Sequence, residues 1–213
     1  MSEAVAYAQR DGIAEVVLDD GKVNAMSAAL FDRLNAALDR AIADGSGALV
    51  IAGRSGYFSA GLNIKLLPTL PAEELTRTLV SFGRTLLRVW TFPLPTVAAV
   101  TGHAVAGGAM LAFACDRRFV ADGPFRIQLN ETAIGLTLPT WALVICESVI
   151  PVRWHAEAML HARPFSPAEA LAREMIDRGA YAATKRRLRS RAVAWAEQHL
   201  EAEMAALPIR ASG

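Results

Sequence analysis

Glu131 is a carboxylate in a mostly apolar stretch, RIQLNETAIGL at residues 126–136. Burying an unpaired charge is costly, so such a carboxylate needs a structural partner or a chemical task. One interpretation is structural, with Glu131 capping a turn together with Thr132. The other is catalytic, because an apolar pocket raises the pKa of a glutamate and makes it a stronger base. The stretch by itself leaves both interpretations open.

A second candidate stretch is GYFSAGLNIK, residues 56–65, which follows an apolar run. It holds three small residues in a row, Ser59, Ala60 and Gly61. Small residues let the backbone approach a ligand closely. An ordinary surface loop is the alternative interpretation.

The third candidate stretch is TGHAVAGGAMLAFACD, residues 101–116, where Gly107 and Gly108 precede an apolar helical pattern. The N-terminus of a helix offers free N–H groups and a positive dipole end, which suit developing negative charge. The spacing is not GxGxxG, so it does not predict a dinucleotide site. A tightly packed turn is the alternative interpretation.

The composition narrows the class of protein. Hydrophobic residues make up 53% of the 213 residues and charged residues 20%, which indicates a globular chain. The net charge of +1 creates no field that would recruit nucleic acid or an anionic membrane. The sequence has no apolar run of roughly 18 residues, and MSEAVAYAQRDG lacks the features of a signal peptide, so we expect neither a membrane span nor a secretory leader.

Cysteine and histidine usage favours a cytoplasmic protein without a metal site. Cys115 and Cys146 both lie in apolar segments, which fits two buried thiols in a reducing compartment. The four histidines have no i, i+4 pair and no CxxC partner. They are His103, His155, His161 and His199.

The elements that must position these stretches alternate along the chain. Periodicity predicts strands at 5–7, 13–18, 48–53, 96–100 and 119–121, the third and fourth covered on both faces. Helices are predicted after the cap Ser27 as far as Gly45, from Pro71 along an apolar stripe, and from Gly107 to Cys115. Two more are predicted at 166–179, with Ser166 and Glu169 forming a capping box, and at 185–206. This order predicts an α/β core.

In order and spacing, the three stretches resemble the crotonase superfamily of enoyl-CoA hydratases and isomerases. FSAGLNIK is similar to its acyl-CoA loop, AVTGHAVAGGAMLAFACD to its second signature and LNETAIGLTLPTW to its third. The motifs look closest to Δ3,Δ2-enoyl-CoA isomerases. The resemblance implies an α/β superhelix of ββα units over residues 1–160, followed by a short helical region over 161–213.

The resemblance also implies roles for individual residues. The backbone N–H groups of Leu62 and Gly107 would bind the thioester oxygen and stabilise an enolate, an arrangement worth about 3–4 kcal/mol per donor. Glu131 would be the acid/base. The implied substrate-binding residues are Ala60, Gly61, Ile64, Gly108, Met110, Asn130 and Trp141.

The resemblance further distinguishes between two reactions. Hydratases of the family carry one carboxylate after the glycines and one in the third segment. Here the first position is Met110, whose thioether cannot exchange a proton, so Glu131 remains. A single carboxylate can remove a proton from C2 and return it at C4, which predicts isomerisation of 3-enoyl-CoA to 2-enoyl-CoA without metal or redox cofactor.

Two alternatives stay open. One is another crotonase-type activity, hydration or thioester hydrolysis, with Glu147 as a candidate second carboxylate. The other is a non-catalytic member that binds acyl-CoA or a partner protein. Relatives continue through further helices that close the acyl pocket and build the trimer contact, whereas this chain is short. The resemblance implies a homotrimer or dimer of trimers. Lys65 and the basic run 185–191 are candidates for the CoA phosphates, although a solvated surface explains them equally.

Overall fold

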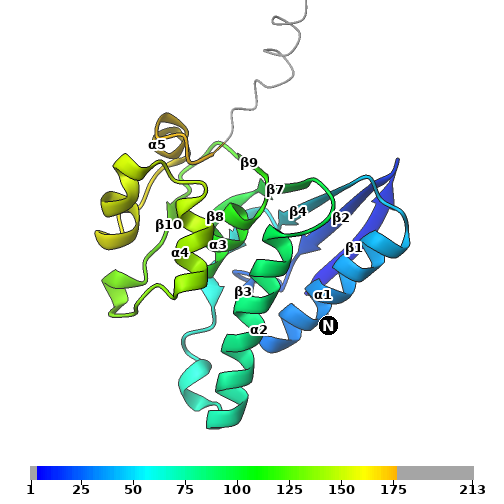
Figure 1. Cartoon of the computed structure of the whole chain (residues 1–213), viewed down its shortest axis with the longest axis horizontal. Coiled ribbons are helices and arrows are strands. Elements are labelled where there is room, and N and C mark those ends of the chain that lie inside the picture. Colours follow the sequence, from blue (N-terminus) through cyan, green and yellow to red (C-terminus); the bar gives the residue numbers. More distant parts are fainter. Residues whose placement is uncertain (1–3, 177–213) are drawn as a thin grey trace, which may run out of the picture. The chain divides into compact units, whose positions relative to one another are not determined.

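The order strand, strand, helix recurs through residues 4–176, the part of the chain that the computed structural model describes (Figure 1). The first unit is β1 (Val5–Arg10), β2 (Ile13–Leu18), β3 (Ala25–Met26) and α1 (Ala28–Ala43). The second is β4 (Ala48–Gly53), β5 (Gly56–Ser59), β6 (Gly61–Leu62) and α2 (Ala72–Trp90), and the third is β7 (Thr96–Val100), β8 (Gly102–Val105) and α3 (Gly107–Ala114). They are followed by β9 (Arg117–Val120), β10 (Ile127–Gln128), α4 (Thr140–Glu147) and α5 (Pro167–Ala172).

Short helical turns connect the later elements. Three are 3-10 helices, at Leu67–Thr69, Thr132–Ile134 and Val152–Trp154, and one is a π-helix, at Ala156–Leu160.

Each unit distributes its strands over more than one sheet. The first sheet has the order β1-β2-β4-β7-β9, with β1 antiparallel to β2 and the other pairs parallel. The second sheet has the order β10-β8-β5 and is parallel throughout, while β3 and β6 form a parallel pair. The predicted α/β fold of ββα units is therefore confirmed.

This topology brings the three candidate stretches together. In the parallel sheet β10-β8-β5 the carboxyl ends of the strands lie at one edge. The residues directly after β5, β8 and β10 are Ala60, Ala106 and Leu129. Ligands commonly bind at the carboxyl ends of parallel strands, so the fold places all three stretches where a site is expected.

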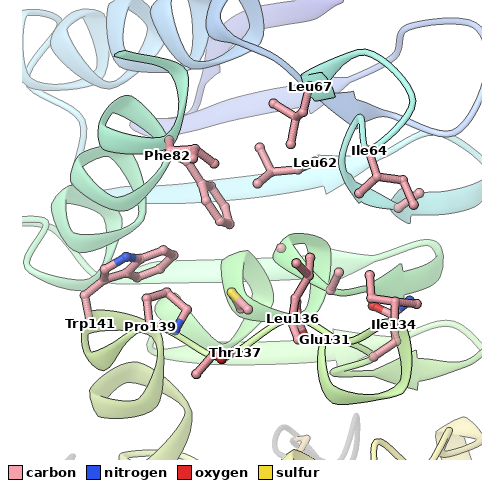
Figure 2. Close-up of a pocket in the computed structure, with 16 residues that line it drawn as sticks. Leu62, Ile64, Leu67, Phe82, Glu131, Ile134, Leu136, Thr137, Pro139 and Trp141 are labelled. Carbon is pink, nitrogen blue, oxygen red and sulfur yellow. The ribbon is translucent and has the colours of Figure 1, made fainter. Parts of the chain in front are cut away.

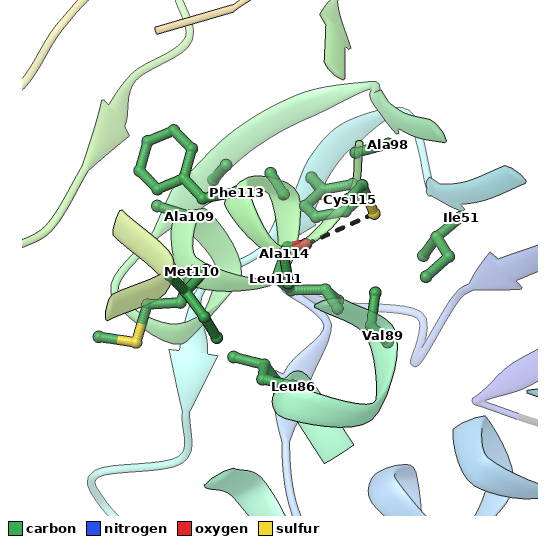
Figure 3. Packing of buried hydrophobic residues seen from close by; sticks show 14 of the residues in the cluster. Ile51, Leu86, Val89, Ala98, Ala109, Met110, Leu111, Phe113, Ala114 and Cys115 are labelled. Carbon is green, nitrogen blue, oxygen red and sulfur yellow. Dashed lines mark hydrogen bonds between the residues drawn. The ribbon is translucent and has the colours of Figure 1, made fainter. Parts of the chain in front are cut away.

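Helix α3 is the centre of the core, because all eight of its residues are buried. Figure 3 shows Leu111 and Met110 of this helix near Leu86 and Val89 of α2, with Ile51 of the first sheet close by. A helix that is apolar on all sides needs other elements around it. α3 contacts α2, α4 and strands of both sheets.

Local signals predicted most element boundaries correctly. Ser27 accepts a hydrogen bond from the Leu30 N–H, and Ser166 forms the full capping box with Glu169. The predicted strand 119–121 is β9, which begins two residues earlier. Strands β4 and β7 are less covered than predicted, because in each of them alternate residues are buried and those between them only half-buried.

Other local predictions were wrong. The stretch 102–105, for which no strand was predicted, is strand β8, and the stretch 56–65 contains β5 and β6, so it is not an ordinary surface loop. The helix predicted over 166–179 ends at Ala172, and Glu174 has a φ of +62°, which a helix does not permit. Gly179 and the predicted helix 185–206 lie outside the described residues. The predicted division at residue 160 stays a prediction.

Three further features concern the described residues. Cys115 and Cys146 are buried, free thiols. Residues 4–176 contain no group of three or more His, Cys, Asp or Glu side chains arranged to hold a metal ion. Over the same range, no helix combines the length and apolar character that a bilayer crossing requires.

Candidate active site

A cavity of about 450 Å³ opens at the carboxyl ends of the parallel sheet. This volume is within the range of small-molecule sites. Its lining is mostly apolar and comes from the three candidate stretches and from α2. The described residues that line it are Ala60, Leu62, Ile64, Leu67, Leu79, Phe82, Ala106, Gly107, Met110, Asn130, Glu131, Ile134, Leu136, Thr137, Pro139 and Trp141.

Two walls face each other across this cavity in Figure 2. One carries Leu62, Ile64 and Leu67 from the second unit, together with Phe82 of α2. The other comes from the segment after β10 and the start of α4. Its labelled residues are Glu131, Ile134, Leu136, Thr137, Pro139 and Trp141. An elongated apolar ligand would contact both walls.

Glu131 is the one titratable side chain among the described residues that line the cavity. It is 8% exposed, and burial raises the pKa of its carboxyl group. Its Oε2 atom is buried and has no hydrogen-bond partner among the described residues. A buried carboxylate oxygen without a partner is unusual and calls for a functional explanation.

The structural interpretation of Glu131 does not hold. The turn at Thr132–Ile134 has no side-chain cap hydrogen bond from Glu131. Instead, the backbone carbonyl of Glu131 accepts hydrogen bonds from the N–H groups of Ile134 and Leu136, at 3.1 and 2.9 Å. Backbone hydrogen bonds therefore stabilise the turn, and the Glu131 side chain lines the cavity.

Asn130 and Met110 complete the surroundings of this carboxylate. The Oδ1 atom of Asn130 is also buried without a hydrogen-bond partner among the described residues. Met110 is 2% exposed and belongs to the lining. By the resemblance, it occupies the position where hydratases would carry a second carboxylate. Glu147 is exposed at the end of α4 and does not belong to the lining.

Glycines bring the second and third units into close contact. A Cβ atom on Gly61 would stand 2.7 Å from the backbone nitrogen of Gly107, and one on Gly108 would stand 2.1 Å from the Ser59 carbonyl oxygen. Gly61 also has a φ of +80°. Gly61 and Gly108 do not line the cavity. Their lack of a side chain lets the backbone at residues 59–61 approach the backbone at the start of α3.

The start of α3 is a helix N-terminus of the general kind at which anions bind. Gly107 is the first residue of the helix, so its N–H group has no acceptor within the helix. The first intrahelical bond is donated by Met110 to the carbonyl of Ala106. Ala106 has a φ of +51°, and backbone strain of this kind tends to occur at functional sites.

A buried hydrogen-bond network fixes the segment that leads to Leu62. The Asn24 amide is fully buried and donates to the carbonyls of Leu18 and Phe58, at 2.8 and 3.1 Å. The Ser59 hydroxyl donates to the carbonyl of Asn24 at 2.7 Å and accepts from the Gly61 N–H at 3.1 Å. Hydrogen bonds of the Asn24 and Ser59 side chains therefore fix the backbone just before Leu62.

The structure brings together eight of the ten predicted site residues, all in the cavity lining. They are Ala60, Leu62, Ile64, Gly107, Met110, Asn130, Glu131 and Trp141. Sequence reasoning missed the other eight described lining residues, which are Leu67, Leu79, Phe82, Ala106, Ile134, Leu136, Thr137 and Pro139. Leu79 and Phe82 belong to an apolar stripe that predicted α2, and helical period gives no sign of which stripe residues face a cavity.

Three other residues that we considered lie apart from this lining. Asp116 accepts hydrogen bonds from the Thr96 N–H and hydroxyl, at 2.7 and 3.0 Å, which gives it a structural role. His103 accepts from the Arg126 N–H and packs on Tyr57. Lys65 is exposed, and the basic run 185–191 lies outside the described residues.

Comparisons with known proteins show which proteins the chain resembles. The family model described as enoyl-CoA hydratase/isomerase matches residues 8–209. Human mitochondrial enoyl-CoA delta isomerase 1 is 31% identical over 169 residues, which cover 78% of this chain and 56% of that protein. The chain spans between half and three fifths of the curated relatives it matches.

Solved structures share the fold, and some of them are named hydratases and others isomerases. An enoyl-CoA hydratase from Mycobacterium ulcerans aligns with a TM-score of 0.78 and 33% identity, covering 95% of this chain and 100% of that one. Human mitochondrial Δ3,Δ2-enoyl-CoA isomerase aligns with a TM-score of 0.79 and 29% identity, covering 82% and 70%.

Proposed function

Because the chain belongs to the enoyl-CoA hydratase/isomerase family, we propose that it isomerises 3-enoyl-CoA to 2-enoyl-CoA with Glu131 as acid and base. One observation carries the proposal. Of the described residues around the cavity, Glu131 is the one that can exchange a proton near neutral pH. Moving a double bond requires one such group, whereas hydration requires a proton at C2 and an activated water.

The reaction begins with removal of a proton from C2. The Glu131 carboxylate takes this proton, and the electron pair moves toward the thioester oxygen to give a dienolate. The N–H groups of Leu62 and Gly107 stabilise the charge on that oxygen, as preorganised donors do in other acyl-transfer and enolate chemistry. The close approach of Gly61 to the Gly107 nitrogen supports this pairing.

The reaction ends with return of the same proton. Protonated Glu131 donates it to C4, the double bond comes to lie between C2 and C3, and Glu131 is again a carboxylate. Burial, which raises the pKa of Glu131, favours both steps because it strengthens the base and keeps the acid competent. Asn130, beside it, orients the carboxylate or contacts the thioester.

A paired assay of the purified protein tests this proposal. One arm supplies a 3-enoyl-CoA and follows ultraviolet absorbance, which rises as the conjugated 2-enoyl thioester forms. The other supplies a 2-enoyl-CoA and follows loss of that absorbance through hydration. We expect signal in the first arm and none in the second. Hydration would reveal a second acid/base and contradict the proposal, and silence in both arms with acyl-CoA bound would favour a non-catalytic binding role.

Other expectations about the whole protein remain predictions. The resemblance predicts a homotrimer or dimer of trimers, and the composition predicts a cytoplasmic location with no nucleic-acid partner. No metal or redox cofactor is needed by the proposed reaction, in which CoA takes part as a portion of the substrate.

A further inference from the structure

Trp141 stands between the cavity and a second hollow of about 400 Å³ on the surface of α2. Both hollows are lined by Trp141 and Leu79. The second hollow continues over Val80, Gly83 and Leu87, and its two polar lining residues in the described part of the chain are Thr76 and Arg84. The indole ring is therefore a partition between the two hollows.

Packing on α2 fixes the position of this indole. Trp141 lies in the first turn of α4, and a Cβ atom on Gly83 would stand 3.1 Å from its Nε1 atom. The helix thus offers bare backbone at Gly83, against which the ring fits. The ring also meets Phe82 edge-on, with centroids 5.0 Å apart and planes at 89°. Such aromatic pairs add stability beyond their buried area.

The partition lies away from the reacting group. In Figure 2, Trp141 and Phe82 stand at one end of the cavity, with Glu131, Ile64 and Ile134 toward the other. A thioester placed between Glu131 and Gly107 would direct its acyl chain toward the indole. The space available to that chain ends where the ring begins.

The surface beyond the indole suits an alkyl chain. Leu79 and Val80, which line this surface, are 43% and 45% exposed, so two adjacent large apolar side chains are open to solvent. An alkyl chain that passed the indole would cover them. If no alkyl chain can pass the indole, Leu79 and Val80 stay exposed to water, and the volume of the cavity limits the length of the acyl chain that binds.

We infer that Trp141 determines acyl-chain length, so that the protein prefers short and medium chains. Replacing the indole joins the two hollows and admits long chains. This inference rests on the proposed function, since it needs an acyl-CoA bound with its thioester at Glu131.

The test compares a short and a long substrate, 3-hexenoyl-CoA and 3-dodecenoyl-CoA, in wild type and Trp141→Leu. We expect the ratio of kcat/KM for the long over the short substrate to rise at least about tenfold, a discrimination that methylene groups give in apolar pockets. Trp141→Phe, which keeps an aromatic ring against Gly83, should give a smaller rise. The Phe variant also serves if the Leu variant fails to fold.

Trp90→Leu is the matched control. Trp90 is a tryptophan on α2 that is 37% exposed and does not line either hollow. Its replacement should leave the chain-length ratio unchanged. Thermal unfolding of every variant separates loss of folding from a change in preference.

Affinity measurements separate this inference from the proposed function. Titration calorimetry with saturated hexanoyl-CoA and dodecanoyl-CoA requires no turnover, and the same change in ratio is expected. A wild type that binds but does not isomerise would overturn the proposed function, while the affinity ratio would still judge the inference. An unchanged ratio in both Trp141 variants, an equal change with Trp90→Leu, or no acyl-CoA binding at all would overturn the inference.

Discussion

The chemistry that we propose for the cavity depends on one carboxyl group. Glu131 lies among apolar side chains, and its Oε2 atom has no protein partner within the described residues. A structural glutamate would be expected to have hydrogen bonds, since leaving a buried polar atom unpaired costs about 1–3 kcal/mol. The fold accepts that cost at the position where proton transfer is proposed.

Glu131→Gln should reduce kcat for 3-enoyl-CoA isomerisation at least about 10²–10⁴-fold, the usual contribution of a general base. The amide has nearly the same shape, so the circular dichroism spectrum and the unfolding temperature should stay close to those of wild type. Glu147→Gln, on the exposed end of α4, is the control and should keep full activity. A Glu131→Gln variant that kept most of the activity would remove Glu131 from the mechanism.

The pH dependence should follow the environment of the same residue. Burial raises the pKa of Glu131, and the reaction needs its ionised form. As the pH falls through that raised pKa, the base becomes protonated and kcat/KM declines. A profile of log kcat/KM against pH should therefore break above the ordinary glutamate value of about 4.3. A break at or below the ordinary value would show that burial does not control this group.

At the scale of the elements, close approach between β5 and α3 shapes the site. The Ser59 carbonyl occupies the space that a side chain at position 108 would need. A Cβ atom at position 108 is fixed to its Cα atom, and the Ser59 oxygen belongs to the backbone. The clash between them can therefore be relieved only by shifting α3 or β5. The distance between the two proposed N–H donors, on Leu62 and Gly107, depends on this contact.

Gly108→Ala should therefore separate α3 from β5. Forcing an extra methyl group into a packed region costs about 1–3 kcal/mol, which denaturant unfolding would measure, and kcat should fall further than stability explains. Gly47→Ala is the control, because its nearest atom would be the Gly12 carbonyl oxygen at an ordinary 3.7 Å. If Gly108→Ala and Gly47→Ala unfold at the same denaturant concentration, the close approach of residue 108 to Ser59 does not limit the size of the side chain at position 108.

Sequence reasoning succeeded where local physics decides. Ser27 and Ser166 cap their helices through bonds to residues three positions away, and such short-range signals are visible in the sequence. It failed where distant residues decide. Strand β8 is a strand because β5 and β10 pair with it on either side, and those partners cannot be read from residues 102–105.

The candidate site shows the same division. Glu131 and Gly107 were predictable because their motifs carry the family resemblance. Leu79 and Phe82 were not, since an apolar stripe on α2 looks the same whether it meets a core or a cavity. Phe82 is 6% exposed and Leu79 is 43% exposed, although both belong to one stripe.

At the scale of the whole described structure, α3 joins the site to the core. Its first residue contributes the proposed N–H donor, and its later residues pack between α2, α4 and both sheets (Figure 3). Leu111, in the middle of the helix, is fully buried. Stability and activity should therefore fall together when this helix is disturbed.

Leu111→Ala should lower the free energy of unfolding by about 2–5 kcal/mol, the usual cost of removing a large apolar side chain from a core. Chemical denaturation measures this change. Leu160→Ala, at a position 68% exposed, should change it by less than about 0.5 kcal/mol. Equal effects at the two positions would contradict the assignment of α3 as the centre of the core.

Because the ends of three strands contribute different parts of the candidate site, the fold also bears on how new reactions arise in evolution. The segment at Ala60–Leu62 follows β5, the segment at Gly107 follows β8, and Glu131 follows β10. Each strand end thus presents its own contribution on a common frame. In the proposed mechanism, backbone N–H groups after β5 and β8 bind the thioester oxygen, so a lineage can exchange the side chains at positions 110 and 131 while inheriting those donors unchanged. Divergence between hydration and isomerisation then requires few substitutions, at the two strand ends that carry these positions.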